Sequence, residues 1–177
     1  MKTEPIGSIP RPPSLIEAIA EFQSGVRSRA QLDNGYASAL RGTIRRFEET
    51  ESTIFTDGEQ TKPSFATYPL SGLNNLAADG VVVPFADGHT RHLPRLTAGP
   101  FRYAVHATEF TRTARSYAQL PVKQAVISAS ALSLIYPSEE IPSYPRQAFL
   151  ADLIDETEMD IRGALGAGAD SVQIDFT

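Results

Sequence analysis

A regular alternation of short apolar runs with long helical stretches most constrains the fold, and the last apolar run lies at residues 171–175. Such an alternation indicates parallel strands joined by helices. No helical stretch follows the last run within the 177 residues, although parallel strands are normally buried on both faces. A closed parallel barrel needs eight strand–helix units. The sequence therefore predicts an α/β fold of the (β/α)8 TIM-barrel type, truncated after the fourth strand.

Four segments are predicted to be the barrel strands: residues 6–9, 53–56, 122–128 and 171–175. Helical spacing of apolar residues predicts helices over residues 14–24, 28–50, 104–120 and 145–162, with shorter turns at 63–68 and 129–136. Ser14 is the expected N-cap of the first helix, and Pro145 suits the first turn of the last helix. The whole chain is thus predicted to be one domain.

Residues 79–100 interrupt this alternation and predict a β-hairpin inserted after the second strand–helix unit. Two extended runs, 81–85 and 89–96, flank Asp87 and Gly88, and this pair of residues favours a tight turn. Pro84 lacks the N–H group needed for a ladder hydrogen bond, so its strand is expected at an edge. We expect the hairpin to lie above the barrel.

Charge and composition exclude several classes of protein. The net charge is -5 and the basic residues do not cluster, which disfavours a nucleic-acid groove or an anionic membrane surface. The absence of cysteine excludes disulfides and thiolate metal ligands within these residues. No apolar stretch has the length of a membrane span, and the N-terminus lacks the apolar core of a signal peptide. A cytoplasmic location is the resulting expectation.

Polar residues follow the predicted strands at the ends that converge on one face of a parallel barrel. Ser8 follows the first strand, Glu59 the second and Asp175 the fourth, while the third offers Ser128 and Ser130. Two carboxylates and a hydroxyl around one pocket suit a cationic amine, or a metal if further ligands exist. Each acid taken alone fits a helix N-cap or a loop salt bridge equally well.

Other residues near these strand ends have two interpretations each. Arg11 is placed to meet a substrate carboxylate or phosphate, or is a solvated loop arginine. Gly7 and Gly58 suit close approach of the backbone to a ligand, or turns with positive φ. Four aromatic residues fit either a wall over the pocket or simple core packing: Phe65, Tyr68, Phe101 and Tyr103.

Metal, nucleotide and nucleophile motifs are weak or missing. His89 and His92 are three residues apart, which places them on opposite faces of an extended strand and disfavours a shared metal. His106 stands alone, and exposed loop histidines are the alternative for all three. The sequence has no phosphate-binding loop with lysine and no serine in a nucleophile elbow.

Taken in order, four short blocks resemble the cobalamin-independent methionine synthase family over nearly the whole chain: residues 6–12, 57–65, 121–123 and 173–175. Members of this family have a catalytic (β/α)8 barrel in which zinc activates the thiol of homocysteine for methylation by a methylated folate. The resemblance implies a methyltransferase-like chain corresponding to the N-terminal half of that barrel. It also implies that Ile6 and Ser8 contact the amino acid, and that Glu59 and Asp175 bind its ammonium group.

Departures from the family pattern leave the activity open. Asp57 and Gln60 stand where family synthases commonly have histidine and proline, so thiol alkylation of another substrate is an alternative. The family's zinc ligands, a histidine, cysteines and a glutamate, lie beyond the matched blocks, which predicts a chain that is inactive alone. Two further alternatives are a non-catalytic half-barrel that pairs with a second half or another copy, and the related tetrapyrrole decarboxylases, for which Arg11 is thin support.

Overall fold

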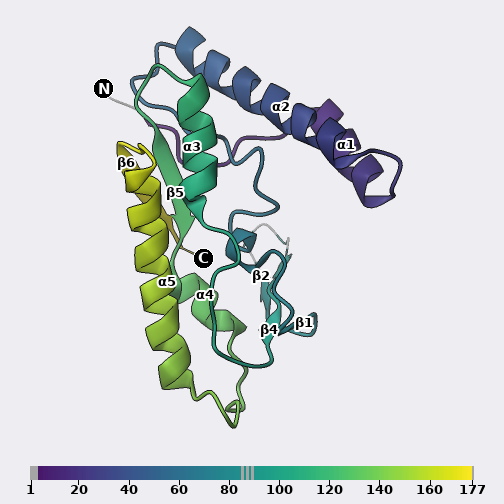
Figure 1. The fold of residues 1–177 in the computed structure, drawn as a ribbon, viewed down its shortest axis with the longest axis vertical. Helices are drawn as coiled ribbons and strands as arrows, with labels where there is room; N and C mark the ends of the chain where they lie inside the picture. Colours follow the sequence, from purple (N-terminus) through teal and green to yellow (C-terminus); the bar gives the residue numbers. More distant parts are fainter. Residues whose placement is uncertain (1–3, 85, 87, 89, 177) are drawn as a thin grey trace.

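A small parallel sheet covered by helices forms the centre of the computed structural model, which describes residues 4–84, 86, 88 and 90–176 (Figure 1). The sheet pairs β5 (Lys123–Ile127) with β6 (Ser171–Asp175) in parallel. Two helices pack on each other and on this sheet, α3 (Ala107–Tyr117) and α5 (Arg146–Gly166). Helices against parallel strands confirm the predicted α/β class. Among the described residues the strands form three two-stranded sheets and no closed barrel.

The second predicted strand, residues 53–56, is reduced to a single parallel bridge between Phe55 and Val122. Phe55 N donates to the Pro121 carbonyl at 3.1 Å, and Lys123 N donates to the Phe55 carbonyl at 2.8 Å. The ladder goes no further because the chain turns at once: Gly58 has φ of 62°. The predicted strand was therefore too long, although its place beside β5 was right.

The first predicted strand, residues 6–9, is an extended segment without a regular ladder. Ile9 N donates to the Gly58 carbonyl at 3.0 Å, and the Thr56 hydroxyl donates to the Gly7 carbonyl at 2.9 Å. Pro10 has no N–H group with which to extend the pairing. The four predicted strand segments consequently lie side by side in chain order, which is the order expected of consecutive barrel strands.

The main hydrophobic core surrounds β5, whose five residues are all buried. Aromatic side chains dominate this core, and the rings of Phe101 and Phe149 meet edge to face with centroids 5.3 Å apart. Tyr68, Phe101 and Tyr103 are all buried there, so the core interpretation of these aromatics is correct. Phe65 is only partly buried and remains near the predicted site. Two short elements complete this part of the core: α4 (Ala129–Leu132) and the 3-10 turn η2 (Ser133–Ile135).

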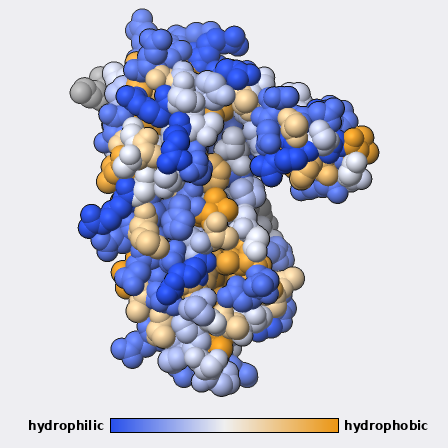
Figure 2. Space-filling view, in the orientation of Figure 1, coloured by the Kyte–Doolittle hydropathy of each residue, from blue (hydrophilic) through white to orange (hydrophobic). Residues whose placement is uncertain are grey.

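Two helices form an arm that projects from the body, α1 (Pro13–Gln23) and α2 (Arg29–Glu49), as Figures 1 and 2 show. Leu15 and Leu32 are buried between them. Ser28 caps α2 through a reciprocal pair of hydrogen bonds with Gln31, which explains the sharp start of the helix. The prediction that Ser14 caps α1 was wrong, because α1 already begins at the preceding proline and its N-cap makes no side-chain hydrogen bond.

The predicted hairpin is present, with β2 (Val82–Pro84) antiparallel to β3 (Thr90–His92). A second pair extends its base, β1 (Leu76–Ala77) with β4 (Arg95–Leu96), and the 3-10 turn η1 (Tyr68–Leu70) precedes it. Two-residue strands carry no readable alternation, so the sequence did not predict this pair. Asp87 and His89, on which the predicted turn and histidine pair depend, lie outside the described residues.

Asp160 of α5 fixes the start of α3. Its Oδ1 accepts a hydrogen bond at 2.5 Å from the backbone N of Ala107, the first residue of α3, and its Oδ2 accepts one from the Tyr68 hydroxyl. Burial raises the pKa of this carboxyl, whereas its hydrogen bonds from Tyr68 and Ala107 oppose that shift. One buried acid on α5 therefore joins the start of α3 to Tyr68 of the core. No helix in the described part of the chain is long and apolar enough to cross a membrane.

Replacing Asp160 with leucine is expected to lower the free energy of unfolding by about 2–4 kcal/mol, because two buried donors lose their acceptor. Urea denaturation measures this loss. Asp155→Leu on the exposed face of the same helix is the matched control and should change stability by less than about 0.5 kcal/mol. Equal effects of the two substitutions would contradict the role given to Asp160.

Candidate functional site

A pocket of about 630 Å³ opens where the first extended segment meets the turn after residue 56. The lining combines a carboxylate, two guanidinium groups, two hydroxyls and an aromatic ring: Glu59, Arg11, Arg91, Ser8, Ser64 and Phe65. These residues come from the first segment, the second turn and the hairpin, which are far apart in sequence. A pocket with charges of both signs suits a zwitterionic or otherwise mixed-charge ligand.

The turn that carries Glu59 is held in an unusual backbone conformation. Gly58 and Glu59 have φ of 62° and 55°, and a left-handed residue other than glycine is uncommon. Glu59 N donates to Asp57 Oδ1 at 2.9 Å, which stabilises the turn. A Cβ atom on Gly58 would lie 2.9 Å from Thr43 Cγ2, so glycine is required there for space as well as for φ. The sequence had offered this turn as one interpretation of Gly58.

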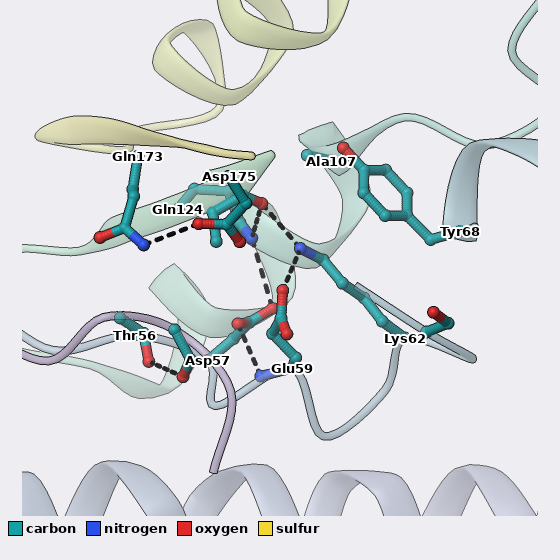
Figure 3. Close-up of polar contacts among 12 residues, drawn as sticks. Thr56, Asp57, Glu59, Lys62, Tyr68, Ala107, Gln124, Gln173 and Asp175 are labelled. Atoms are coloured by element: carbon teal, nitrogen blue, oxygen red, sulfur yellow. Dashed lines mark hydrogen bonds and ion pairs between the residues drawn. The ribbon is translucent and has the colours of Figure 1, made fainter. Parts of the chain in front are cut away.

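Lys62 is a residue of this region that sequence reasoning missed. Its side chain is fully buried, and Nζ lies 3.1 Å from Glu59 Oε1 and 2.7 Å from the Ala125 carbonyl oxygen (Figure 3). The same ammonium group lies 4.6 Å from the ring centroid of Tyr68, a favourable cation–π distance. The only signal in the sequence was a lysine three positions after a candidate carboxylate. Its burial depends on the neighbouring strand and could not be inferred.

Glu59 lies in an environment that disfavours its charge. Burial raises the pKa of the Glu59 carboxyl above its usual 4.5, Lys62 opposes the shift, and the nearby charges of Asp57 and Asp175 add to it. Asp175 therefore lies near enough for its charge to act on Glu59, and both residues belong to the region drawn in Figure 3, although Asp175 does not line the pocket. Asp175 Oδ1 accepts a hydrogen bond from Gln173 Nε2 at 2.8 Å, which orients it at the end of β6.

The other residues that the sequence predicted near the site differ in whether they line the pocket. Ser8 is exposed and lines the pocket. Ile6 is 75% exposed and does not line it, so its predicted backbone contact with an amino acid stays a prediction. The Ser128 hydroxyl caps α4 by accepting from Ala131 N at 3.1 Å, and it lies 3.0 Å from the Ser130 hydroxyl. The third strand therefore supplies structural hydroxyls at this end.

Arg11 stabilises the turn rather than standing open to a ligand. Its guanidinium group donates to the carbonyls of Gln60 at 3.3 Å, Glu59 at 3.4 Å and Lys62. Three backbone acceptors on one arginine tie the first segment to residues 59–62. Of the two interpretations of Arg11, the structure favours neither a solvated side chain nor a free substrate ligand.

Histidines and acids do not assemble a metal centre in the part of the chain that the structure describes, where no group of three possible ligands is close enough. His92 is exposed on β3, and His106 lies 3.2 Å from Glu156 against the core. The sequence also has no cysteine. The residues present therefore do not fit a zinc site.

Comparison with solved structures identifies proteins with a similar fold. The chain superposes on a B12-independent methionine synthase from Shewanella sp. W3-18-1 in complex with selenomethionine with a TM-score of 0.73. The two are 18% identical over 97% of this chain and 50% of that one. A putative vitamin-B12 independent methionine synthase from Listeria monocytogenes gives a TM-score of 0.69 and 20% identity, over 98% of this chain and 52% of that one.

This chain shares its fold with B12-independent methionine synthase structures. It spans about half the length of each of these two chains. No family model matches the sequence, and no curated protein matches it. The likeness therefore supports at the level of fold the family that the four sequence blocks indicated, and the activity is a separate question.

Proposed function

We propose that this chain forms the amino-acid-binding half of a methionine-synthase-like barrel, which methylates the thiol of homocysteine from a methylated folate or a similar donor. Glu59 and Asp175 bind the substrate ammonium group, and Ser8 and the backbone at Ile6 contact the rest of the amino acid. The observation that carries this proposal is the buried Glu59 carboxylate in the lining of a pocket that Ser8 also lines, with the negative charge of Asp175 near enough to affect it. The selenomethionine bound to the Shewanella protein is a chemically related amino acid.

An ammonium group between two carboxylates makes charge-assisted hydrogen bonds with both and relieves their mutual repulsion. Lys62 occupies Glu59 Oε1, which leaves the second oxygen of that carboxylate for a ligand. The arrangement selects for a primary amine over a neutral or anionic end group. These residues bind and orient an amino acid, and they do not fit a zinc ion that would activate its thiol.

The edge of β6 supports the proposal of a half-barrel. β5 is buried throughout, whereas four residues of β6 are half-buried and Ile174 is 44% exposed. Only one edge of β6 is paired among the described residues. In the two solved structures, about half of the chain lies beyond the part that matches. A complementary half-barrel is the partner that this edge fits, and it would also supply the zinc ligands.

Titration calorimetry with L-homocysteine tests the proposed function. We expect weak, saturable binding that Glu59→Gln lowers at least tenfold, because the ammonium group loses a charged partner. Glu48→Gln on the exposed face of α2 is the matched control and should leave binding unchanged. Tight binding of a porphyrin with no binding of homocysteine would overturn the proposal and favour the decarboxylase alternative.

The same titration with other amino thiols addresses the thiol alkyltransferase alternative. The Asp57 carboxylate accepts a hydrogen bond from Glu59 N and so stabilises the turn. Aspartate in place of the family's histidine therefore affects how Glu59 is positioned. A clear preference for an amino thiol other than homocysteine would support the amine site and show that the substrate is that other thiol. Methyl transfer to homocysteine by the 177-residue chain alone would contradict the half-barrel proposal.

A further inference from the structure

Arg91 gives the pocket a second charge preference that the ammonium site does not explain. It is the central residue of β3 and is half-buried, whereas its neighbours Thr90 and His92 are exposed. Arg91 pairs directly with Val83, which packs against the core, and directly paired residues lie on the same face of a hairpin. The alternation of the strand therefore turns Arg91 toward the body and into the lining of the pocket.

The guanidinium group of Arg91 is positioned by an aromatic ring. Its Cζ lies 4.6 Å from the ring centroid of Phe65, within the range of a cation–π contact. Stacking fixes the plane of the guanidinium group and leaves the N–H donors along its edge available. A carboxylate, sulfonate or phosphate binds such an edge through bidentate hydrogen bonds. Phe65 also lines the pocket, so the stacked pair faces the same space as Glu59.

The other arginine of the pocket does not offer this chemistry, because Arg11 is engaged by three backbone carbonyls of the turn. Arg91 comes from the hairpin and Glu59 from the turn, so different elements supply a cation and an anion to one pocket. A ligand that satisfies both has an ammonium group at one end and an acidic group at the other.

We propose that Arg91, stacked on Phe65, is a specificity residue that binds a second anionic group of the substrate, distant from its ammonium group. The substrate class is then an amino acid whose side chain, or an extension of it, carries a carboxylate, sulfonate or phosphate. This inference rests on the proposed function for the ammonium end and adds a requirement for the other end. Homocysteine itself has no such group, so an acidic relative or conjugate of it would bind more tightly.

Two probes of equal chain length separate the contributions: L-norleucine and L-2-aminoadipate, which differ by a terminal carboxylate. Wild-type protein is expected to bind aminoadipate at least tenfold more tightly in calorimetry, and Arg91→Gln should abolish this preference while keeping norleucine affinity. Arg95→Gln is the matched control, because Arg95 lies on β4, the next strand along the chain, pairs with Asp79 at 2.9 Å and lines a different pocket. It should keep the preference.

Each failure has a distinct meaning. Equal affinity for the two probes, or a preference that survives in Arg91→Gln, overturns the inference and leaves the ammonium site standing. If neither amino acid binds, the proposed function fails, and inorganic phosphate is titrated into wild-type protein and Arg91→Gln instead. Phosphate binding that depends on Arg91 supports the anion subsite alone, and its absence, or equal binding by both proteins, overturns the inference.

Discussion

Replacing Lys62 with methionine is expected to lower the free energy of unfolding by about 3–5 kcal/mol at neutral pH, the usual cost of removing one partner of a buried ion pair. Methionine keeps the volume and the contact with Tyr68 but leaves the Glu59 carboxylate and the Ala125 carbonyl oxygen without their donor. Because the Lys62 side chain is fully buried and Glu59 is 4% exposed, water replaces the ammonium group poorly. Urea denaturation at pH 7 measures the loss.

The effect of Lys62→Met should depend on pH with a defined sign. Without Lys62, the pKa of Glu59 in the folded state rises further above its usual 4.5, because burial is no longer opposed. An acid with a raised folded-state pKa contributes stability below its unfolded pKa and loses it as pH rises through the folded value. The deficit of the variant is therefore expected to be smallest below pH 4.5 and to grow as pH rises through the raised folded-state pKa of Glu59.

A double-mutant cycle separates the ion pair from general packing damage. Glu59→Gln added to Lys62→Met removes the uncompensated charge, so the double variant should be more stable than the sum of the two single losses by about 2 kcal/mol or more. Strictly additive losses would show that Lys62 stabilises the fold without acting on Glu59, and the role given to Lys62 at the site would have to be withdrawn.

The sequence predicted well those elements whose signals are local. The helical spacing of apolar residues predicted a helix over residues 28–50, close to the observed α2, and the extended runs on either side of residue 88 indicated the β2–β3 hairpin. The strands at 6–9 and 53–56 were overestimated, because pairing depends on the turn at Gly58 and on prolines that interrupt the ladder. A strand-like composition does not say how many hydrogen bonds the neighbouring segment can accept.

The candidate site was predicted in part for a related reason. Strand ends converge in any parallel arrangement, so the electrostatic influence of Asp175 on Glu59 agrees with the topology, while their role in binding stays a prediction. Lys62 and Arg91 were missed because each is brought in by tertiary packing: Lys62 by burial against Ala125, and Arg91 by its stack on Phe65 in the hairpin. Arg11 lines the pocket, but neither role predicted for it is seen, because it is engaged by three backbone acceptors that were not foreseeable from its position.

Binding of an amine ligand to the pocket is expected to weaken about tenfold for each pH unit below the raised pKa of Glu59, since the protonated carboxyl no longer attracts an ammonium group. Above that pKa the affinity should be constant until the ligand itself loses its proton. The inflection is expected above 4.5, because burial outweighs the opposing effect of Lys62 on the Glu59 carboxyl. Calorimetry with L-norleucine between pH 4.5 and 8 gives the profile without interference from a thiol.

Two variants decide whether that inflection belongs to Glu59. Glu59→Gln should bind norleucine weakly and lack the inflection, whereas Asp175→Asn should bind weakly but keep it, shifted to lower pH because a neighbouring negative charge is gone. An inflection that persists in Glu59→Gln would assign the titration to another group. If both variants bind like the wild type, the ammonium group of the ligand lies elsewhere, and the pairing of Glu59 with Lys62 serves the fold alone.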